Sequence, residues 1–145
     1  MKKQLIALFG VGDAGKTTTI RKVRDLLLAK YIDAKEETLN GRLRVEIFSI
    51  ITIKGKRIGI TSRGDRDIHV KFALEKFAQE KCQIILCATR TKGSGSWNAM
   101  EKFAAKHQYT IREIQKIKEQ IKAKQDNANK KDAATIVKII RDSLI

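Results

Sequence analysis

A glycine-rich segment near the start of the chain has residue types and a spacing that could bind phosphate. Residues 10–17 read Gly-Val-Gly-Asp-Ala-Gly-Lys-Thr and meet the pattern G-x-x-x-x-G-K-[ST] at every fixed position. Glycines let the backbone wrap closely around an anion, and successive amides at a helix N-terminus donate hydrogen bonds to its oxygens. The lysine would neutralise phosphate charge, and the threonine hydroxyl would coordinate Mg²⁺. The segment therefore predicts a site for a phosphate-bearing ligand.

The sequence on either side of this segment predicts a strand before it and a helix after it. Residues 5–9 form an unbroken apolar run, which is typical of a strand covered on both faces. Over residues 17–30, apolar side chains recur at helical spacing among charged ones, at Ile20, Val23, Leu26 and Leu27. A buried strand that turns through glycines into an amphipathic helix is the arrangement that this phosphate chemistry requires.

In this context the chain resembles the P-loop nucleoside triphosphatase superfamily. The resemblance is specific over residues 4–30 and extends more weakly, through the order of strands and helices, to residue 116. The run Gly-Lys-Thr-Thr-Thr at residues 15–19 is similar to the loop of signal-recognition GTPases. The resemblance implies a nucleotide that is bound by Gly10, Gly12, Asp13, Ala14, Gly15, Lys16, Thr17 and Thr18. It also implies that Lys16 acts in catalysis by offsetting charge that develops on the phosphates.

The acid that P-loop enzymes carry at the end of a neighbouring strand is missing from its usual place. The corresponding strand is predicted over residues 57–61, and no acidic residue ends it. The nearest carboxylate is Asp65, with Asp67 as the second choice. We take Asp65 as the candidate catalytic acid, and Asp65 and Thr17 as the candidate Mg²⁺ ligands. The alternative is that one of the two aspartates only caps the following helix.

The second buried strand is predicted over residues 83–88, and a basic loop follows it over residues 89–96. If that strand is parallel to the first, the loop lies at the same edge of the sheet as the glycine-rich segment. Arg90 is then a candidate catalytic residue that stabilises charge on a transferring phosphoryl group, and Lys92 is a candidate contact to base or phosphates. A solvent-exposed basic loop is an equally strong interpretation, and Arg63 and Arg66 face the same choice.

The expected nucleotide is ATP, bound with Mg²⁺. The guanine-reading pattern N-K-x-D is absent after the second buried strand, where residues 89–93 read Thr-Arg-Thr-Lys-Gly. The D-x-x-G pattern of small GTPases keeps its glycine at residues 61–64 and loses its aspartate. Because no aspartate is placed to pair with guanine, GTP is disfavoured.

These residues lead to three hypotheses about function. The first is binding of Mg-ATP with hydrolysis, catalysed by positioning and electrostatic stabilisation. The second is a small kinase that transfers the γ-phosphoryl group to a small acceptor such as a nucleotide. The third is a non-catalytic module that binds a nucleotide or a nucleic acid. The partners expected are a nucleoside triphosphate and, for the kinase, a phosphoryl acceptor; a second copy that completes the site as a homodimer is an open alternative.

Composition restricts the class of protein further. The chain has 145 residues and a formal net charge of +15, and the positive excess is spread along its length rather than gathered in a nucleic-acid-binding tail. Nucleic acid is therefore a less favoured partner. No stretch approaches the ~20 apolar residues of a membrane-spanning helix, so no membrane partner is expected. Cys82 and Cys87 are interpreted as reduced core thiols, which favours a cytoplasmic location.

The remaining pattern predicts an α/β fold in one domain, residues 1–145. We expect a three-layer sandwich with a mostly parallel sheet, of the P-loop nucleoside triphosphatase type, including one antiparallel hairpin that turns at Lys54 and Gly55. Helices are predicted over residues 67–81 and 97–107, the second with Asn98 and Glu101 at capping-box spacing, and a strand at the start of residues 109–116. Residues 118–131 are expected to form a mobile polar connection, and Asp132 to cap a last helix.

Overall fold

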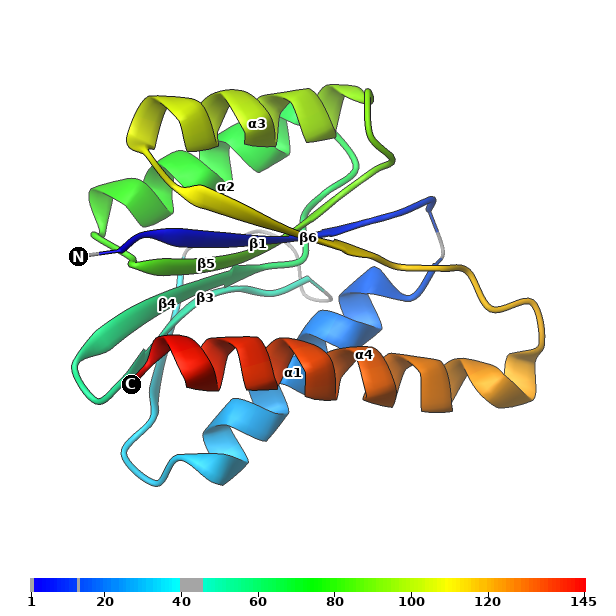
Figure 1. The fold of residues 1–145 in the computed structure, drawn as a ribbon, viewed down its shortest axis with the longest axis horizontal. Coiled ribbons are helices and arrows are strands. Elements are labelled where there is room, and N and C mark those ends of the chain that lie inside the picture. Colours follow the sequence, from blue (N-terminus) through cyan, green and yellow to red (C-terminus); the bar gives the residue numbers. More distant parts are fainter. Residues whose placement is uncertain (1, 13, 40–45) are drawn as a thin grey trace.

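The computed structural model describes residues 2–12, 14–39 and 46–145, which form six strands and four helices. In chain order these elements are β1 (Gln4–Phe9), α1 (Lys16–Lys30), β2 (Lys35–Thr38), β3 (Phe48–Ile53), β4 (Lys56–Thr61), α2 (Asp67–Gln79), β5 (Ile84–Thr89), α3 (Gly95–His107), β6 (Thr110–Gln115) and α4 (Lys122–Ser143). The strands build one sheet in the order β2-β3-β4-β5-β1-β6 (Figure 1).

The sheet is mixed. Strands β4, β5, β1 and β6 pair in parallel, whereas β2, β3 and β4 pair antiparallel. The parallel strands therefore end at a common edge, and the loops that follow β1, β4, β5 and β6 all leave from it. In α/β proteins this edge is where ligands bind.

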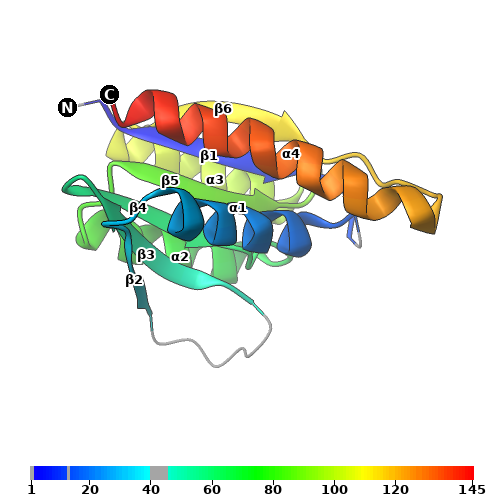
Figure 2. The same ribbon diagram turned by 90° about the horizontal axis from the view of Figure 1, so that it is seen from below.

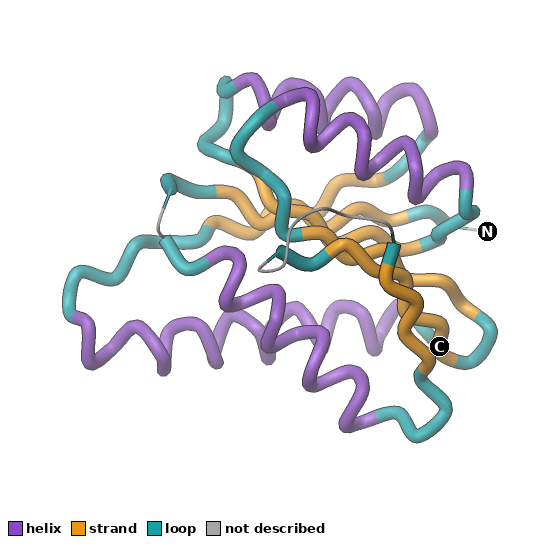
Figure 3. The backbone as a smooth tube through the Cα atoms, turned by 180° about the vertical axis from the view of Figure 1, so that it is seen from behind, coloured by secondary structure: helices purple, strands orange, loops and turns teal. Residues whose placement is uncertain are grey.

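Helices cover both faces of the sheet. Figures 1 and 3 show α1 and α4 on one side of the strands and α2 and α3 on the other, and Figure 2 shows α1 and α4 side by side across one face. The alternation of side chains in a strand divides the core accordingly. In β1, Ile6 and Leu8 pack in the cluster with α1 and α4, whereas Leu5 and Ala7 pack in the cluster with α2 and α3. A strand buried on both faces explains the unbroken apolar run at residues 5–9.

The α/β class and the antiparallel hairpin are confirmed. Strands β3 and β4 pair from Phe48 opposite Thr61 to Ile53 opposite Lys56. The two turn residues have positive φ, 52° for Lys54 and 78° for Gly55. Two such residues form the turn whose twist matches that of the flanking strands. The edge strand β2, four polar residues read Lys-Glu-Glu-Thr, was not predicted, because such a segment carries no apolar alternation.

Two expectations about helices were wrong. Most of the segment 118–131 belongs to α4, a helix of 22 residues that begins at Lys122, so Asp132 lies inside the helix and does not cap it. The early part of α4 has few apolar residues, but an ion pair between Asp126 and Lys130, one turn apart, supports it, and Lys22 of α1 also pairs with Asp126.

Helix α3 begins earlier than its capping-box spacing suggested. Ser94 is its N-cap residue, and the Ser94 hydroxyl accepts a hydrogen bond from the amide of Trp97 at 3.2 Å. Serine in this role satisfies an amide that the helix itself leaves unbonded. Among the described residues, no helix combines the length and the apolar character needed to cross a membrane.

Candidate functional site

A polar cleft of about 600 Å³ opens at the edge where the parallel strands end. Its walls come from the loop after β1, the start of α1, the loops after β4 and β5, and the N-terminal half of α4. The residues that line it are Gly12, Gly15, Lys16, Thr17, Thr18, Glu46, Ser62, Gly64, Asp65, Arg90, Gln125 and Asn129. The structure thus brings the glycine-rich segment, Asp65 and Arg90 together around one cleft.

Lys16 is the buried cation of this cleft. The residue is only 7% exposed, and its ammonium donates hydrogen bonds to the carbonyl oxygens of Gly10 at 2.6 Å and Thr89 at 2.9 Å. These two bonds join the end of β5 to the start of the glycine-rich segment. Burial, opposed by the charge of Asp65 and reinforced by that of Arg90, lowers the pKa of Lys16 to about 8. Within the described part of the chain, the Lys16 ammonium has no carboxylate partner within ion-pair distance.

The N-terminus of α1 faces the same cleft, and no side chain of the described residues caps it. Its N-cap residue is Gly15, which has a left-handed conformation with φ of 96° and provides no side chain to bond the first amides. The first turn of α1 carries no acidic residue either. The free amides and the positive end of the helix dipole are therefore available to an anion.

Helix α4 closes one wall of the cleft through Asn129. A Cβ atom added at Gly15 would lie 2.6 Å from the Asn129 amide oxygen, so glycine leaves room for the Asn129 side chain in its present position. The same oxygen accepts a hydrogen bond from the Thr19 hydroxyl at 3.3 Å. Asn129 is 9% exposed, and Gln125 lies one turn before it along the same wall.

Arg90 extends over the glycine-rich segment from the other side. A Cβ atom at Gly12 would lie 3.0 Å from both terminal nitrogens of the Arg90 guanidinium. The Arg90 Nε atom donates to the Asp65 carboxylate at 3.0 Å, and the Arg90 amide donates to the Ser96 hydroxyl at 2.9 Å. The ion pair is exposed, with 44% of the Arg90 and 64% of the Asp65 side chain open to solvent. A ligand can therefore reach the guanidinium and compete with Asp65 for it.

The loop after β4 forms the remaining wall. Gly64 passes so close to the Ala88 carbonyl that a Cβ atom would overlap it. The Ser62 hydroxyl accepts a hydrogen bond from the Ile47 amide at 2.8 Å, which ties this loop to the start of β3. Arg63 lies 3.5 Å from the Glu46 carboxylate. Arg63 thus has a carboxylate partner at the rim.

The structure places most of the residues predicted for ligand binding around the cleft. Gly12, Gly15, Lys16, Thr17 and Thr18 line it. Ala14 is buried beside a smaller cavity that Asn129 and Gln125 also line. Gly10 contributes its carbonyl oxygen to Lys16 rather than an exposed surface. Asp13 lies outside the described residues.

Other predicted candidates lie elsewhere. Lys92 forms an ion pair at 2.6 Å with Glu113 of β6 and sits over the rings of Phe9 and Trp97. Asp67 is the first residue of α2, where its carboxylate accepts a hydrogen bond from the next amide. The interpretation of Cys82 and Cys87 as core thiols agrees with their burial, which raises the pKa of each to about 12.

Sequence reasoning missed the contribution of α4. Asn129 and Gln125 lie in the segment expected to be a mobile connection, so neither was considered for the site. The signal that could have indicated a helix there is its content of alanine, lysine and glutamine together with oppositely charged residues four apart.

The expected cofactors are not tested by this geometry. Within the described ranges, no group of three or more histidine, cysteine or acidic residues is arranged to hold a metal ion. Thr17 and Asp65 both line the cleft, and a Mg²⁺ ion held by them would need further oxygen ligands from a phosphate or water. Mg²⁺ and ATP stay predictions.

Comparisons with known proteins give no family for this chain. No protein-family model matches it, and no curated protein matches it. One similar solved structure is that of APE1195, with a TM-score of 0.46 and 15% identity over 99% of this chain and 74% of that one. Another is a futalosine hydrolase mutant of Helicobacter pylori strain 26695, with a TM-score of 0.43 and 12% identity over 97% of this chain and 98% of that one. At these scores neither neighbour assigns a fold family or an activity.

The expected membership of the P-loop nucleoside triphosphatase superfamily is corrected accordingly: no protein-family model matches this chain, and the similar solved structures found are those of APE1195 and a futalosine hydrolase mutant. The three functional hypotheses that depended on that membership were wrong with it: nucleoside triphosphate hydrolysis, kinase activity and a nucleotide or nucleic-acid binding module. What stays is the site itself, whose chemistry can be argued from its own residues.

Proposed function

We propose that the cleft binds the oxyanion group of a small phosphate-bearing molecule. The groups that bind it are the amides at the start of α1, the ammonium of Lys16 and the guanidinium of Arg90. The arrangement of parallel strands between helix layers supports this proposal, because it directs three loops and a helix N-terminus into one cleft.

The single observation that carries the proposal is the environment of Lys16. A lysine that is 7% exposed and whose partners among the described residues are carbonyl oxygens is held at a cost, because burial disfavours its charged form. The two carbonyl oxygens occupy two of its three N–H donors and leave the third for a ligand. An oxyanion beside Lys16 would supply the opposite charge that the buried ammonium lacks.

The uncapped N-terminus of α1 supplies neutral donors to the same anion. Its first amides have no capping side chain in the described part of the chain, and the helix dipole adds a partial positive charge there. Thr17 and Thr18 place two hydroxyl groups beside these amides. A tetrahedral oxyanion can accept several hydrogen bonds at once, so this end of α1 suits phosphate better than a monovalent halide.

Arg90 gives the site a second cation that can move. Its guanidinium lies over Gly12 and is paired with Asp65 through one nitrogen. No hydrogen bond joins its two terminal nitrogens to another described residue, and together they form a fork that suits phosphate oxygens. We expect the anion to take the place of Asp65 as the partner of Arg90.

The untested expectations of a cytoplasmic location and of a second copy at the site stay predictions.

Titration calorimetry with inorganic pyrophosphate tests the proposal. Wild type, Lys16→Met, Arg90→Gln and the control Lys30→Met are compared at equal ionic strength. Lys30 is an exposed lysine in the last turn of α1, so its variant changes the net charge without touching the cleft. We expect Lys16→Met and Arg90→Gln each to weaken binding about tenfold, as loss of a charge-assisted hydrogen bond would, and Lys30→Met to leave it within about twofold.

Arg90 is exposed, so the variant Arg90→Gln still tests the proposal if Lys16→Met fails to fold. Equal weakening in all three variants would show general attraction to a basic protein and would overturn the proposal. Pyrophosphate binding that neither Lys16→Met nor Arg90→Gln changes would also overturn it.

A further inference from the structure

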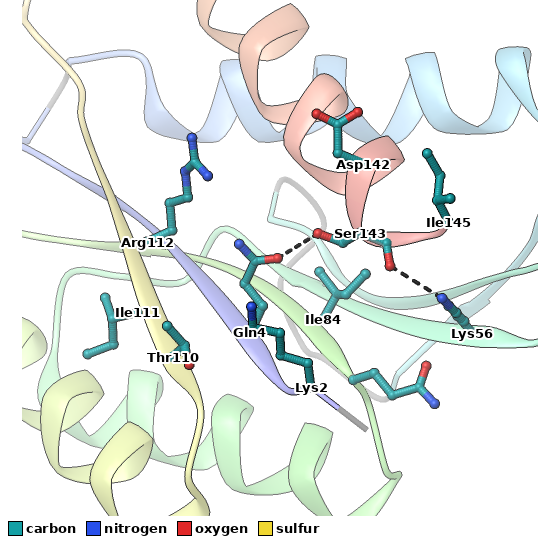
Figure 4. Close-up of a pocket in the computed structure, with 11 residues that line it drawn as sticks. Lys2, Gln4, Lys56, Ile84, Thr110, Ile111, Arg112, Asp142, Ser143 and Ile145 are labelled. Carbon is teal, nitrogen blue, oxygen red and sulfur yellow. Dashed lines mark hydrogen bonds between the residues drawn. The ribbon is translucent and has the colours of Figure 1, made fainter.

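A second pocket of about 590 Å³ lies at the opposite edge of the sheet, where the parallel strands begin. The first residues of β1, β4, β5 and β6 line it, namely Gln4, Lys56, Ile84 and Thr110. Figure 4 shows these side chains gathered around the C-terminal turn of α4, which contributes Asp142 and Ser143. The pocket is separate from the cleft, which lies where the same strands end.

Three cations from three parts of the chain line this pocket. They are Lys2 before β1, Lys56 at the start of β4 and Arg112 on β6. None of the three forms an ion pair, although thirteen ion pairs occur among the described residues. The single acidic side chain of the lining, Asp142, pairs instead with Arg141 at 3.4 Å. The lining therefore carries three basic side chains against one acidic one, and none of the three basic side chains is paired with that acid.

The polar groups of the pocket are partly engaged and partly free. Lys56 donates to the Ser143 carbonyl oxygen at 3.3 Å, and the Ser143 hydroxyl donates to the Gln4 side-chain oxygen at 2.6 Å (Figure 4). These bonds fix Lys56 and Gln4 at the end of α4, with the remaining N–H donors of Lys56 free for a ligand. The side-chain oxygen of Gln83 is buried and has no hydrogen-bond partner among the described residues. An acceptor in this state requires a donor.

We propose that this pocket binds a small anion that carries two or more carboxylate or phosphate groups. Three cations that line one pocket without carboxylate partners give it a positive potential, and an anion with several acidic groups can form charge-assisted hydrogen bonds with more than one of them. This pocket is independent of the oxyanion cleft, so each site can be tested while the other is lost.

Amide chemical-shift titration of the ¹⁵N-labelled protein tests the proposal, with citrate and inorganic pyrophosphate as the two probes. Citrate represents carboxylates and carries a hydroxyl, whereas pyrophosphate represents phosphates. We expect saturable shifts at Gln83, Thr110, Arg112 and Ser143 with at least one probe. Binding of that probe to this pocket should persist in Lys16→Met, where the cleft has lost its buried cation.

Paired variants separate a built pocket from general attraction. Lys2→Gln with Arg112→Gln removes two of the lining cations, and both residues are exposed, so the fold is kept. Lys102→Gln with Lys138→Gln removes the same charge from exposed helix positions outside the pocket. We expect the first pair to weaken binding at least about tenfold and the second to leave it within about twofold.

Three results would overturn the proposal. The first is the absence of saturable shifts around the pocket with either probe. The second is equal weakening by both pairs of substitutions, which would indicate attraction to net charge alone. The third is that every shift at this edge disappears in Lys16→Met, which would mean that the shifts report binding at the cleft.

Discussion

The affinity of the cleft for sulfate should fall as the pH rises through about 8. Sulfate does not titrate near neutral pH, so it reports the protonation of the protein alone. Burial lowers the pKa of Lys16 to about 8 in the free protein. A bound dianion favours the ammonium form and raises that pKa, so the complex binds more protons than the free protein above pH 8. By linkage, affinity must then decrease with rising pH.

The magnitude follows from the free-state pKa. Below about pH 7 Lys16 is almost fully protonated, and affinity should not depend on pH. At pH 9, one unit above the Lys16 pKa of about 8, only about a tenth of the molecules carry the ammonium. If sulfate binds only to that form, the dissociation constant at pH 9 is about tenfold higher than at pH 7, which corresponds to about 1.4 kcal/mol.

Calorimetric titrations with sulfate across this range, at constant ionic strength, measure the effect. Lys30→Met is the control and should reproduce the wild-type profile, because its site is at the far end of α1. Lys16→Met should bind weakly at every pH, with no break near pH 8. A dissociation constant that stays flat from pH 7 to pH 9, or a break that persists in Lys16→Met, would refute the role given to this lysine.

Two further predictions concern the walls of the cleft. Gly15→Ala should lower the free energy of unfolding in urea by about 1–3 kcal/mol, because φ is 96° at this position and the new Cβ atom would meet Asn129. Gly93→Ala is the control and should cost only about 1 kcal/mol, because φ is 87° there but no atom lies within 4 Å of the new Cβ; equal losses in the two variants would mean that the contact with Asn129 contributes nothing. Asp65→Asn should raise sulfate affinity about two- to fivefold in the same calorimetric assay, because it frees Arg90 from its carboxylate partner, and should change stability by less than about 1 kcal/mol, since the ion pair is exposed. An unchanged or weaker affinity in Asp65→Asn would mean that the two side chains do not compete.

Much of the fold could be predicted because its elements bury apolar side chains in regular patterns. The unbroken run at residues 5–9 indicated β1, and the hairpin turn at Lys54 and Gly55 followed from a glycine between two apolar segments. The polar half of α4 could not be predicted in this way. It is held by charge pairs of Asp126 with Lys130 and Lys22, and such pairs leave no hydrophobic period.

The site could be predicted where the backbone imposes a residue type. Only glycine suits the left-handed N-cap of α1, and the spacing to Lys16 follows from the helix that begins there. The contribution of Asn129 depends on a helix more than 100 positions later, and no local pattern encodes that contact. The prediction of membership in the P-loop superfamily was wrong for a related reason. A short motif specifies a local geometry for binding anions, and it does not by itself specify the reaction or the family.

The central claim is that the cleft binds an oxyanion through the start of α1, Lys16 and Arg90. The most direct test is an amide chemical-shift titration of the wild-type protein with pyrophosphate. We expect saturable shifts at the amides of residues 15–18 and at Arg90, and their loss in Lys16→Met. Saturable binding that leaves these amides unmoved would contradict it.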